Sequence, residues 1–256
     1  MNASAPVLET RGLTIRFGGH VAVNDVSCAF APGSLTAIVG PNGAGKTTYF
    51  NLISGQLPAT KGQVLVKGED VTRLPASART RRGLGRAFQL TNLFPNLTVS
   101  ENVRLAVQAR AHAGLSLLTL WTDRRDLMSA ARTILDRVRL ADRRDVIAGT
   151  LPHGDQRKLE VALLIALEPD VFMFDEPTAG MSVDEVPNVL EIIGELKREG
   201  SKTILLVEHK MDVVRSLAER IIVLHNGALV ADGEPAQVMA SAIVREAYLG
   251  QEIGHG

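Results

Sequence analysis

The sequence predicts an α/β protein built on a parallel sheet, with an N-terminal antiparallel β subdomain and an inserted α-helical subdomain. Three observations predict it. The first third is rich in β-branched residues separated by glycine turns, residues 100–145 change to Ala, Leu and Arg at helical spacing, and the remainder alternates helix-like with strand-like segments. Alternation of this kind is typical of a parallel sheet covered by helices.

Segments of the N-terminal third are expected to form strands. Val7–Phe17, Val21–Phe30 and Gln63–Lys67 carry β-branched or alternating apolar residues. Turn signals at Gly18-Gly19 and Pro32-Gly33 separate them. This pattern predicts short strands that pair in an antiparallel β subdomain.

The middle of the chain is expected to be a helical insertion. Its apolar residues recur at helical spacing, namely at Leu127, Ala131, Ile134, Leu135 and Val138. At 256 residues the chain is long for one simple domain and short for two large ones. We therefore expect a single domain over 1–256, in which 1–90 and 150–256 form the core with the β subdomain and about 91–149 forms the insertion.

The last part of the chain predicts alternating helices and strands. We expect helices at Asp155–Leu167, Pro187–Lys197 and Val213–Glu219, and strands at Val171–Phe174 and Thr203–Val207. The pair Asn226-Gly227, between two apolar runs, is a strong hairpin signal.

Composition narrows the class of protein. A formal net charge of zero argues against a general nucleic-acid binder, and 45% hydrophobic residues suit a folded globular protein. The single cysteine, Cys28, excludes an internal disulfide framework and is expected to be a small core residue. We expect a soluble protein, because no signal-peptide pattern is visible and no apolar run approaches the roughly 20 residues of a membrane-spanning helix.

The most specific motif is a phosphate-binding loop, or P-loop. The template Gly-x-x-x-x-Gly-Lys-Ser/Thr is filled at every fixed position, by Gly40, Pro41, Asn42, Gly43, Ala44, Gly45, Lys46 and Thr47, with Thr48 next. The loop follows the apolar run Leu35–Val39 and opens an expected helix, so its backbone N–H groups would gather at the positive end of a helix dipole. Lys46 would reach the β- and γ-phosphates, and the Thr47 hydroxyl would be available to Mg²⁺. The motif predicts a P-loop NTPase core.

A second candidate site lies directly after the apolar strand expected at Val171–Phe174. It consists of Asp175 and Glu176, which the strand would deliver to the ligand-binding edge of the sheet. Asp175 suits Mg²⁺ coordination, and Glu176 is placed to polarise an attacking water. The metal would offset the repulsion between the two carboxylates. Taken alone, the same Asp-Glu-Pro pattern is also compatible with a helix cap.

Over essentially its full length, the chain resembles the nucleotide-binding subunit of ABC transporters. The matching elements stand in the family's order, namely Phe17 at the aromatic that stacks on adenine, the P-loop, Gln89 at the glutamine loop, Leu151–Gln156 at the signature, Phe172–Glu176 at Walker B and His209 at the switch histidine. Taken singly, Phe17, Gln89 and His209 would each fit an ordinary structural role. Their joint order identifies the family.

The resemblance implies hydrolysis of ATP, with ATP and Mg²⁺ as cofactors. Lys46 and the metal would neutralise the phosphates, and the implied metal ligands are Thr47, Gln89 and Asp175. Glu176 would orient or deprotonate water, and Gln89 would sense the γ-phosphate. His209 could bridge the γ-phosphate and the base, because a neutral imidazole offers one donor and one acceptor.

The resemblance also implies an assembly. ATP would lie between two subunits, with Gly154 of the signature facing the ATP bound by the partner. The implied partners are transmembrane permease subunits, a second ATPase subunit and, indirectly, a solute-binding protein, with no nucleic acid. The implied location is cytoplasmic, peripheral on the inner face of the cell membrane.

The signature departs from the family pattern. The common form is Leu-Ser-Gly-Gly-Gln, whereas this chain has Pro152 in place of the serine and Asp155 near the expected phosphate. Ser182 stands where the family usually has an aspartate. Loss of one transition-state donor can cost on the order of 10²–10³ in rate at comparable sites. Two arrangements remain open: a heterodimer with a subunit whose signature is intact, or a homodimer in which His153 or backbone groups compensate.

Three segments of the chain resemble the larger ATPase of branched-chain and hydrophobic amino-acid importers. They are the run Leu151–Glu160, the turn Ala179-Gly-Met and the ending Ala247–Gly250. These segments do not identify the solute, so urea, short amides and other amino acids stay open. A lipid or lipopolysaccharide exporter is the other transport alternative, although its signature should be closer to Ser-Gly-Gly. A repair or translation ATPase usually has two cassettes or long charged arms, and this chain has neither.

Two remaining features are a basic stretch and the single tryptophan. The basic stretch Arg79, Arg81, Arg82 and Arg86 is expected to be a solvated face rather than an interface, since exposed charges usually are solvated. Trp121 is expected to pack inside the helical insertion or against a membrane subunit.

Overall fold

The computed structural model describes residues 5–87, 93–111, 125–241 and 244. The chain forms two compact units. The first consists of Met1–Arg86, Asp170–Glu176 and Leu196–Gly256, and the second of Ala87–Pro169 and Pro177–Glu195. The chain therefore passes from one unit to the other directly after Arg86 and again directly after Glu176. Trp121 lies outside the described residues.

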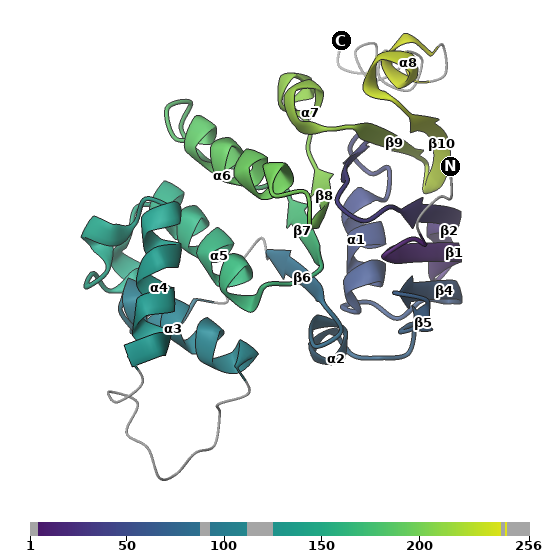
Figure 1. Cartoon of the computed structure of the whole chain (residues 1–256). Coiled ribbons are helices and arrows are strands. Elements are labelled where there is room, and N and C mark those ends of the chain that lie inside the picture. Colours follow the sequence, from purple (N-terminus) through teal and green to yellow (C-terminus); the bar gives the residue numbers. More distant parts are fainter. Residues whose placement is uncertain (1–4, 88–92, 112–124, 242–243, 245–256) are drawn as a thin grey trace. The chain divides into compact units, whose positions relative to one another are not determined.

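One sheet of the first unit is antiparallel and has four strands (Figure 1). These are β1 (Leu8–Phe17), β2 (His20–Phe30), β4 (Lys61–Val66) and β5 (Glu69–Asp70), in the order β2-β1-β4-β5. Gly18, with φ of 57°, lies in the tight turn that joins β1 to β2 and sets Phe17 opposite His20. The predicted antiparallel β subdomain is confirmed.

The other sheet of the first unit has six strands in the order β10-β9-β3-β8-β7-β6. Its strands are β3 (Leu35–Val39), β6 (Leu84–Ala87), β7 (Val171–Asp175), β8 (Thr203–Val207), β9 (Arg220–His225) and β10 (Ala228–Gly233). β3 pairs in parallel with β8 and β9, and β7 pairs in parallel with β8, whereas β10 is antiparallel to β9. The carboxyl ends of β3, β7 and β8 therefore share one edge, where open α/β sheets bind ligands.

Helix α1 packs between the two sheets of the first unit. Its Tyr49 and Phe50 share an apolar core with Phe30 of β2 and Val207 of β8. Two short helices cover the opposite face of the parallel sheet, where they pack on β3 and β9. The helices of this unit are α1 (Lys46–Ser54), α2 (Ala76–Thr80), α7 (Met211–Leu217) and α8 (Pro235–Ala240). This packing holds α1, which carries the P-loop lysine, against the sheet that contains β3.

The second unit is helical in its described residues. It contains α3 (Val99–Arg110), α4 (Arg125–Arg137), α5 (His153–Leu167), most of α6 (Val186–Arg198) and the 3₁₀ turns η2 (Ala141–Arg143) and η3 (Ala148–Thr150). Thr98 and Glu101 form a capping box that begins α3. The unit has wider bounds than the insertion expected at about 91–149, because it also takes in α5 and most of α6.

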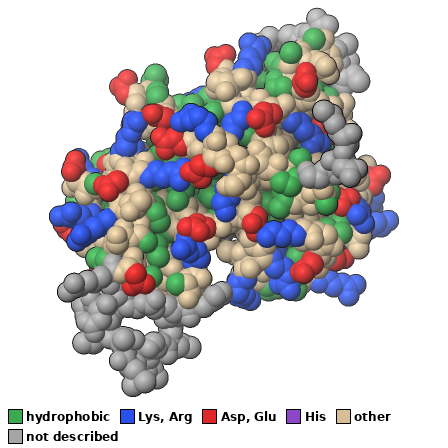
Figure 2. Space-filling view, viewed as in Figure 1, with side chains coloured by type: hydrophobic (Ala, Val, Ile, Leu, Met, Phe, Trp, Pro, Cys, Tyr) green, Lys and Arg blue, Asp and Glu red, His purple; other side chains and the backbone are tan. Residues whose placement is uncertain are grey.

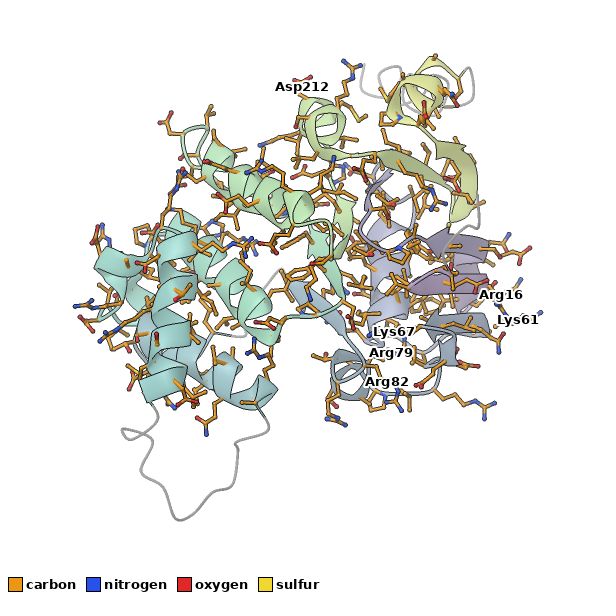
Figure 3. The ribbon with its side chains drawn as sticks, viewed as in Figure 1. Arg16, Lys61, Lys67, Arg79, Arg82 and Asp212 are labelled. Carbon is orange, nitrogen blue, oxygen red and sulfur yellow. The ribbon has the colours of Figure 1, made fainter. Side chains whose placement is uncertain are left out.

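The expectation of a solvated arginine face was wrong for two of its four residues. Arg79 and Arg86 are only 2% and 9% exposed, whereas Arg81 and Arg82 are exposed. Arg79 of α2, labelled in Figure 3, donates hydrogen bonds at 2.6 and 2.7 Å to two of the last carbonyl groups of α1. A helix leaves these carbonyls without donors, so a buried guanidinium can be satisfied there.

The surface carries charges of both signs. Lys and Arg are interspersed with Asp and Glu over the face shown in Figure 2, which matches the 28 basic and 28 acidic residues of the sequence. None of the helices in the described part of the chain combines the length and apolar character needed to cross a membrane. Cys28 is buried, as expected.

Candidate functional site

The phosphate-binding turn begins where β3 ends and requires glycine. Gly40, Gly43 and Gly45 have φ of 149°, 79° and 96°, values that strain a residue with a side chain. A Cβ atom at Gly40 would overlap the carbonyl oxygen of Leu224, and one at Gly45 would overlap that of Ala22. Gly45 is also the N-cap of α1, whose first turn has no acidic residue. The positive end of α1 is thus suited to an anion.

Lys46 is folded back onto this turn. Its Nζ donates hydrogen bonds to the carbonyl oxygens of Gly40 at 2.7 Å and Pro41 at 2.8 Å. Burial lowers the pKa of Lys46, while the carboxylates of Glu176 and Asp175 act to raise that pKa. Because charge-assisted bonds to phosphate are stronger than bonds to neutral carbonyls, a bound phosphate could draw the ammonium away from its present partners.

A cavity of about 410 Å³ opens at the turn, within the size range of small-molecule sites. It is lined by the β1–β2 hairpin, the P-loop and the residues that follow β7 and β8, namely Phe17, His20, Ala22, Asn42, Gly43, Ala44, Gly45, Lys46, Thr47, Thr48, Glu176 and His209. Phe17 is 49% exposed, so its ring is available for stacking. The structure therefore brings together Phe17, the P-loop, Glu176 and His209 as the sequence predicted.

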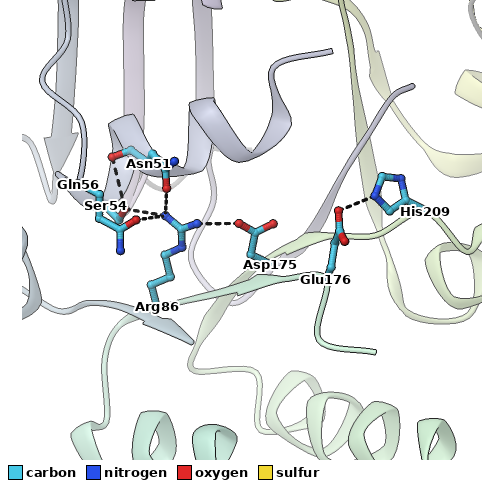
Figure 4. A network of polar contacts seen from close by, with 7 residues as sticks. All are labelled: Asn51, Ser54, Gln56, Arg86, Asp175, Glu176 and His209. Carbon is cyan, nitrogen blue, oxygen red and sulfur yellow. Dashed lines mark hydrogen bonds and ion pairs between the residues drawn. The ribbon is translucent and has the colours of Figure 1, made fainter. Parts of the chain in front are cut away.

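Glu176 directly follows β7 and has an unusual backbone. Its φ of 50° lies in the left-handed region, which costs energy for a residue of this type and often marks a functional site. Its N–H donates to the carbonyl oxygen of Val207, at the end of β8, at 2.9 Å. Its Oε1 lies 2.5 Å from Nε2 of His209 (Figure 4). A carboxylate and an imidazole in contact at the cavity form a pair that can accept and hold a proton.

Asp175, the last residue of β7, is held by one of its two carboxylate oxygens. Oδ2 lies 2.6 Å from a terminal nitrogen of Arg86, whereas buried Oδ1 has no hydrogen-bond partner among the residues described. Burial raises the pKa of Asp175, and Arg86 opposes that rise. A buried carboxylate oxygen without a partner is the donor type that Mg²⁺ prefers.

Of the other predicted site residues, the pair Gly40-Pro41 and Asp175 do not line the cavity but adjoin, in sequence, residues that do. Gln89 lies outside the described residues. Gly154 belongs to the second unit, in the first turn of α5, whose N-cap is Pro152. Proline has no N–H, so this helix start offers one backbone donor fewer than the common signature.

The N-terminus of α5 also carries two carboxylates of its own chain. Asp155 lies in the first turn and accepts from Lys158 Nζ at 2.8 Å. The carboxylate of Glu185 packs on Gly154, where a Cβ atom would overlap it. Glu185 also accepts from the Ser182 N–H at 3.2 Å and hydroxyl at 3.0 Å. These negative charges compensate the positive end of the α5 dipole.

Three residues that line or contact these sites were not predicted as site residues from the sequence. His20 lines the cavity, which the register of a two-residue hairpin around Gly18-Gly19 could have indicated. Arg86 interrupts the short strand β6, and an arginine in a strand of a buried sheet is a sign of a paired charge. Glu185 follows Ser182 by three residues, and Ser-x-x-Glu is the capping-box pattern.

A glycine turn between a parallel strand and a helix, with an acidic pair at the end of β7, defines the chain as a P-loop nucleoside triphosphatase. Residues 23–179 match the family model described as ABC transporter. The chain belongs to this family, and it is an ABC ATPase that binds nucleotide.

Curated relatives match over nearly the whole chain. The high-affinity branched-chain amino acid transport ATP-binding protein LivG of Escherichia coli K12 is 38% identical, over 97% of this chain and 99% of LivG. The protein of the same description from Pseudomonas aeruginosa, BraF, is also 38% identical, over 97% of this chain and 99% of BraF.

Solved structures match as well. A nucleotide-free ATP-binding cassette from an ABC transporter is 28% identical, with a TM-score of 0.81 over 94% of this chain and 98% of that one. The ADP conformation of an ATP-binding cassette of an ABC transporter is 28% identical, with a TM-score of 0.80 over 95% of this chain and 98% of that one.

Proposed function

We propose that the chain is the ATP-hydrolysing subunit of an importer of branched-chain or other hydrophobic amino acids. The observation that carries this proposal is the 38% identity to LivG and BraF over 97% of the chain. The subunit would act at the inner face of the cell membrane, through permease subunits that receive solute from a binding protein.

The residues present fit a Mg²⁺ ion beside the phosphates. Buried Asp175 Oδ1 has no partner among the described residues, and Thr47, whose side chain carries a hydroxyl, lines the cavity. We propose these two as metal ligands, with Gln89 as the third. When bound, Mg²⁺ would neutralise charge on the β- and γ-phosphate oxygens.

Several groups of the cavity have roles in the proposed reaction. Phe17 stacks on the adenine, and the N–H groups of the turn and Lys46 Nζ bind the phosphates. Glu176 orients the attacking water and takes its proton. His209 donates from Nε2 to Glu176 and so holds that carboxylate toward the water. Only as an imidazolium would it also donate, from Nδ1, to the γ-phosphate. Most of the rate comes from positioning and electrostatics, as in other phosphoryl transfers.

We propose that the ATPase partner is a different subunit. Pro152 removes a donor at the start of α5, and the carboxylates of Asp155 and Glu185 lie where a partner's phosphate would approach. A partner with a serine and no acidic residue at these positions would complete the ATP site of this chain. The reverse site, formed by this chain's own signature, would hydrolyse more slowly.

The second unit offers an apolar surface for the permease. Phe94 and Ile147 are 55% and 41% exposed, although both side chains are large and hydrophobic. The segments that carry them run side by side, since Thr98 pairs with Ile147 and Ala148 N–H donates to the Leu97 carbonyl at 2.9 Å. Contiguous exposed apolar patches mark protein contacts, and these neighbouring segments each contribute one large exposed apolar side chain. We therefore propose this surface for coupling to the membrane subunits.

The test is solute uptake in the source cells. The chromosomal copy is replaced by the Glu176→Gln variant, and uptake of radiolabelled leucine, isoleucine, valine and urea is measured. We expect loss of leucine, isoleucine and valine uptake with urea uptake unchanged. Retained uptake of these three amino acids, or selective loss of urea uptake, would contradict the proposed solute class.

A further inference from the structure

Arg86 forms a buried ion pair at the edge of the nucleotide site. Its side chain is 5% exposed and that of Asp175 is 0% exposed, with 2.6 Å between the guanidinium nitrogen and Oδ2. No recognised motif contains this arginine. It is the last residue of the first unit before the chain crosses to the second, and Asp175 lies one residue before the crossing after Glu176. The pair therefore joins two strands just where the chain leaves the nucleotide-binding unit.

The guanidinium of Arg86 is fixed from its other side (Figure 4). One terminal nitrogen donates to Asn51 Oδ1 at 2.6 Å, Ser54 Oγ at 3.0 Å and Gln56 Oε1 at 3.1 Å. These acceptors lie at the end of α1 or just beyond it. The guanidinium carbon also lies 5.6 Å from the ring centre of Phe50, in cation–π geometry. Arg86 thus links the helix that carries the P-loop lysine to the strand that carries Asp175.

The contact leaves half of the carboxylate available. An arginine often binds both oxygens of a carboxylate in a bidentate ion pair. Here one terminal nitrogen binds Oδ2 and the other terminal nitrogen is occupied by α1 and Gln56, while neither Arg86 Nε nor Asp175 Oδ1 has a partner among the described residues. The acceptors around Asn51 fix the guanidinium, and its contact with Asp175 is made through a single nitrogen, which leaves Oδ1 uncovered.

We propose that Arg86 is a positioning residue for Mg²⁺, which holds Asp175 by Oδ2 so that Oδ1 is presented to the metal. The inference rests on the proposed function, because it requires a metal–nucleotide site at Asp175. The outer partners of ligating carboxylates fix their orientation, and their loss typically weakens metal affinity about 10–100-fold.

Metal binding to the ADP complex tests this without catalysis. Protein saturated with ADP is titrated with Mn²⁺, and free Mn²⁺ is measured by electron paramagnetic resonance. ADP affinity in EDTA and the melting temperature are measured for the same samples. The variants are Arg86→Met, Arg86→Lys and the double variant Asn51→Ala/Gln56→Ala. The matched control is Arg79→Met, which removes the other buried arginine from the end of α1 but contacts no carboxylate in the described residues.

We expect Arg86→Met to weaken Mn²⁺ binding about 10–100-fold, with unchanged ADP affinity in EDTA. Arg86→Lys should retain part of the Mn²⁺ affinity, because lysine keeps the positive charge but lacks the planar set of donors of the guanidinium. Arg79→Met should lower the melting temperature and leave Mn²⁺ affinity unchanged.

A folded Arg86→Met protein with wild-type Mn²⁺ affinity would overturn the inference and leave the proposed function standing. An equal loss in Arg79→Met would also overturn it, since the effect would then be structural. If Arg86→Met does not fold, wild-type Mn²⁺ affinity in Asn51→Ala/Gln56→Ala is the overturning result. Absence of Mn²⁺ binding in the wild-type ADP complex would refute both the inference and the proposed metal site.

Discussion

The N-termini of α1 and α5 differ in the charge around them. The start of α1 is capped by Gly45, has no acidic residue in its first turn and carries Lys46. The start of α5 is capped by Pro152, contains Asp155 and packs against the carboxylate of Glu185. A helix N-terminus attracts anions, and nearby carboxylates of the same chain compensate that attraction. The α1 end therefore has no carboxylate in its first turn to oppose a phosphate, whereas the α5 end already has two carboxylates of its own chain beside it.

In the proposed assembly, each ATP lies between the P-loop of one subunit and the signature of the other. The difference between the two helix ends indicates that one chain need not bind phosphate equally well at both of these sites. In the proposed assembly, the P-loop, Glu176 and His209 of the first unit form the strong half of the ATP site. The signature of the second unit forms the weak half, because we propose that Pro152, Asp155 and Glu185 oppose binding of a phosphate there.

The largest effect is expected at Glu176. Glu176→Gln removes the base but keeps the shape of the side chain, so ATP hydrolysis by the assembled transporter should fall by about 10²–10⁴-fold, the usual contribution of a general base. ATP binding should persist. The measurement is phosphate release together with equilibrium nucleotide binding. Hydrolysis at the wild-type rate would assign the base to another residue.

A slightly smaller loss is expected at Lys46. Lys46→Ala removes the cation at the phosphates and should lower hydrolysis on the order of 10²–10³-fold, as loss of one electrostatic group does at comparable sites. Unlike Glu176→Gln, it should also weaken ATP binding. Calorimetric titration of both variants with a non-hydrolysable ATP analogue separates the two roles. Equal affinities in the two variants would contradict the assigned phosphate contact.

The smallest effect is expected at the weak half. In a Glu176→Gln background, Glu185→Gln should strengthen ATP-dependent self-association about two- to fivefold, because a charge at a helix terminus is worth about 0.3–1 kcal/mol. Sedimentation equilibrium at high protein concentration measures this change. Glu191→Gln, which alters an exposed carboxylate elsewhere in the second unit, is the control. Weaker association in Glu185→Gln would show that its carboxylate supports the interface instead.

The sequence predicted the strong half better than the weak half for a physical reason. The P-loop spacing determines a local turn, and the apolar run before Asp175 determines a buried strand, so short segments sufficed. Arg86 was misjudged as solvated because its partners, from Asn51 to Asp175, come together only in the folded sheet. The contact of Glu185 with Gly154 likewise joins segments that are distant in sequence. Polar contacts between distant segments leave no periodic pattern to read.

The most direct test of the asymmetry is the mass in solution of the purified Glu176→Gln chain. Light scattering is recorded with and without Mg-ATP, and nucleotide binding is confirmed in the same sample. We predict a monomer in both conditions, because the signature of this chain opposes closure on a second copy of itself. A stable dimer that forms only with Mg-ATP would contradict this and show that Leu151–Asp155 closes on ATP without a different partner.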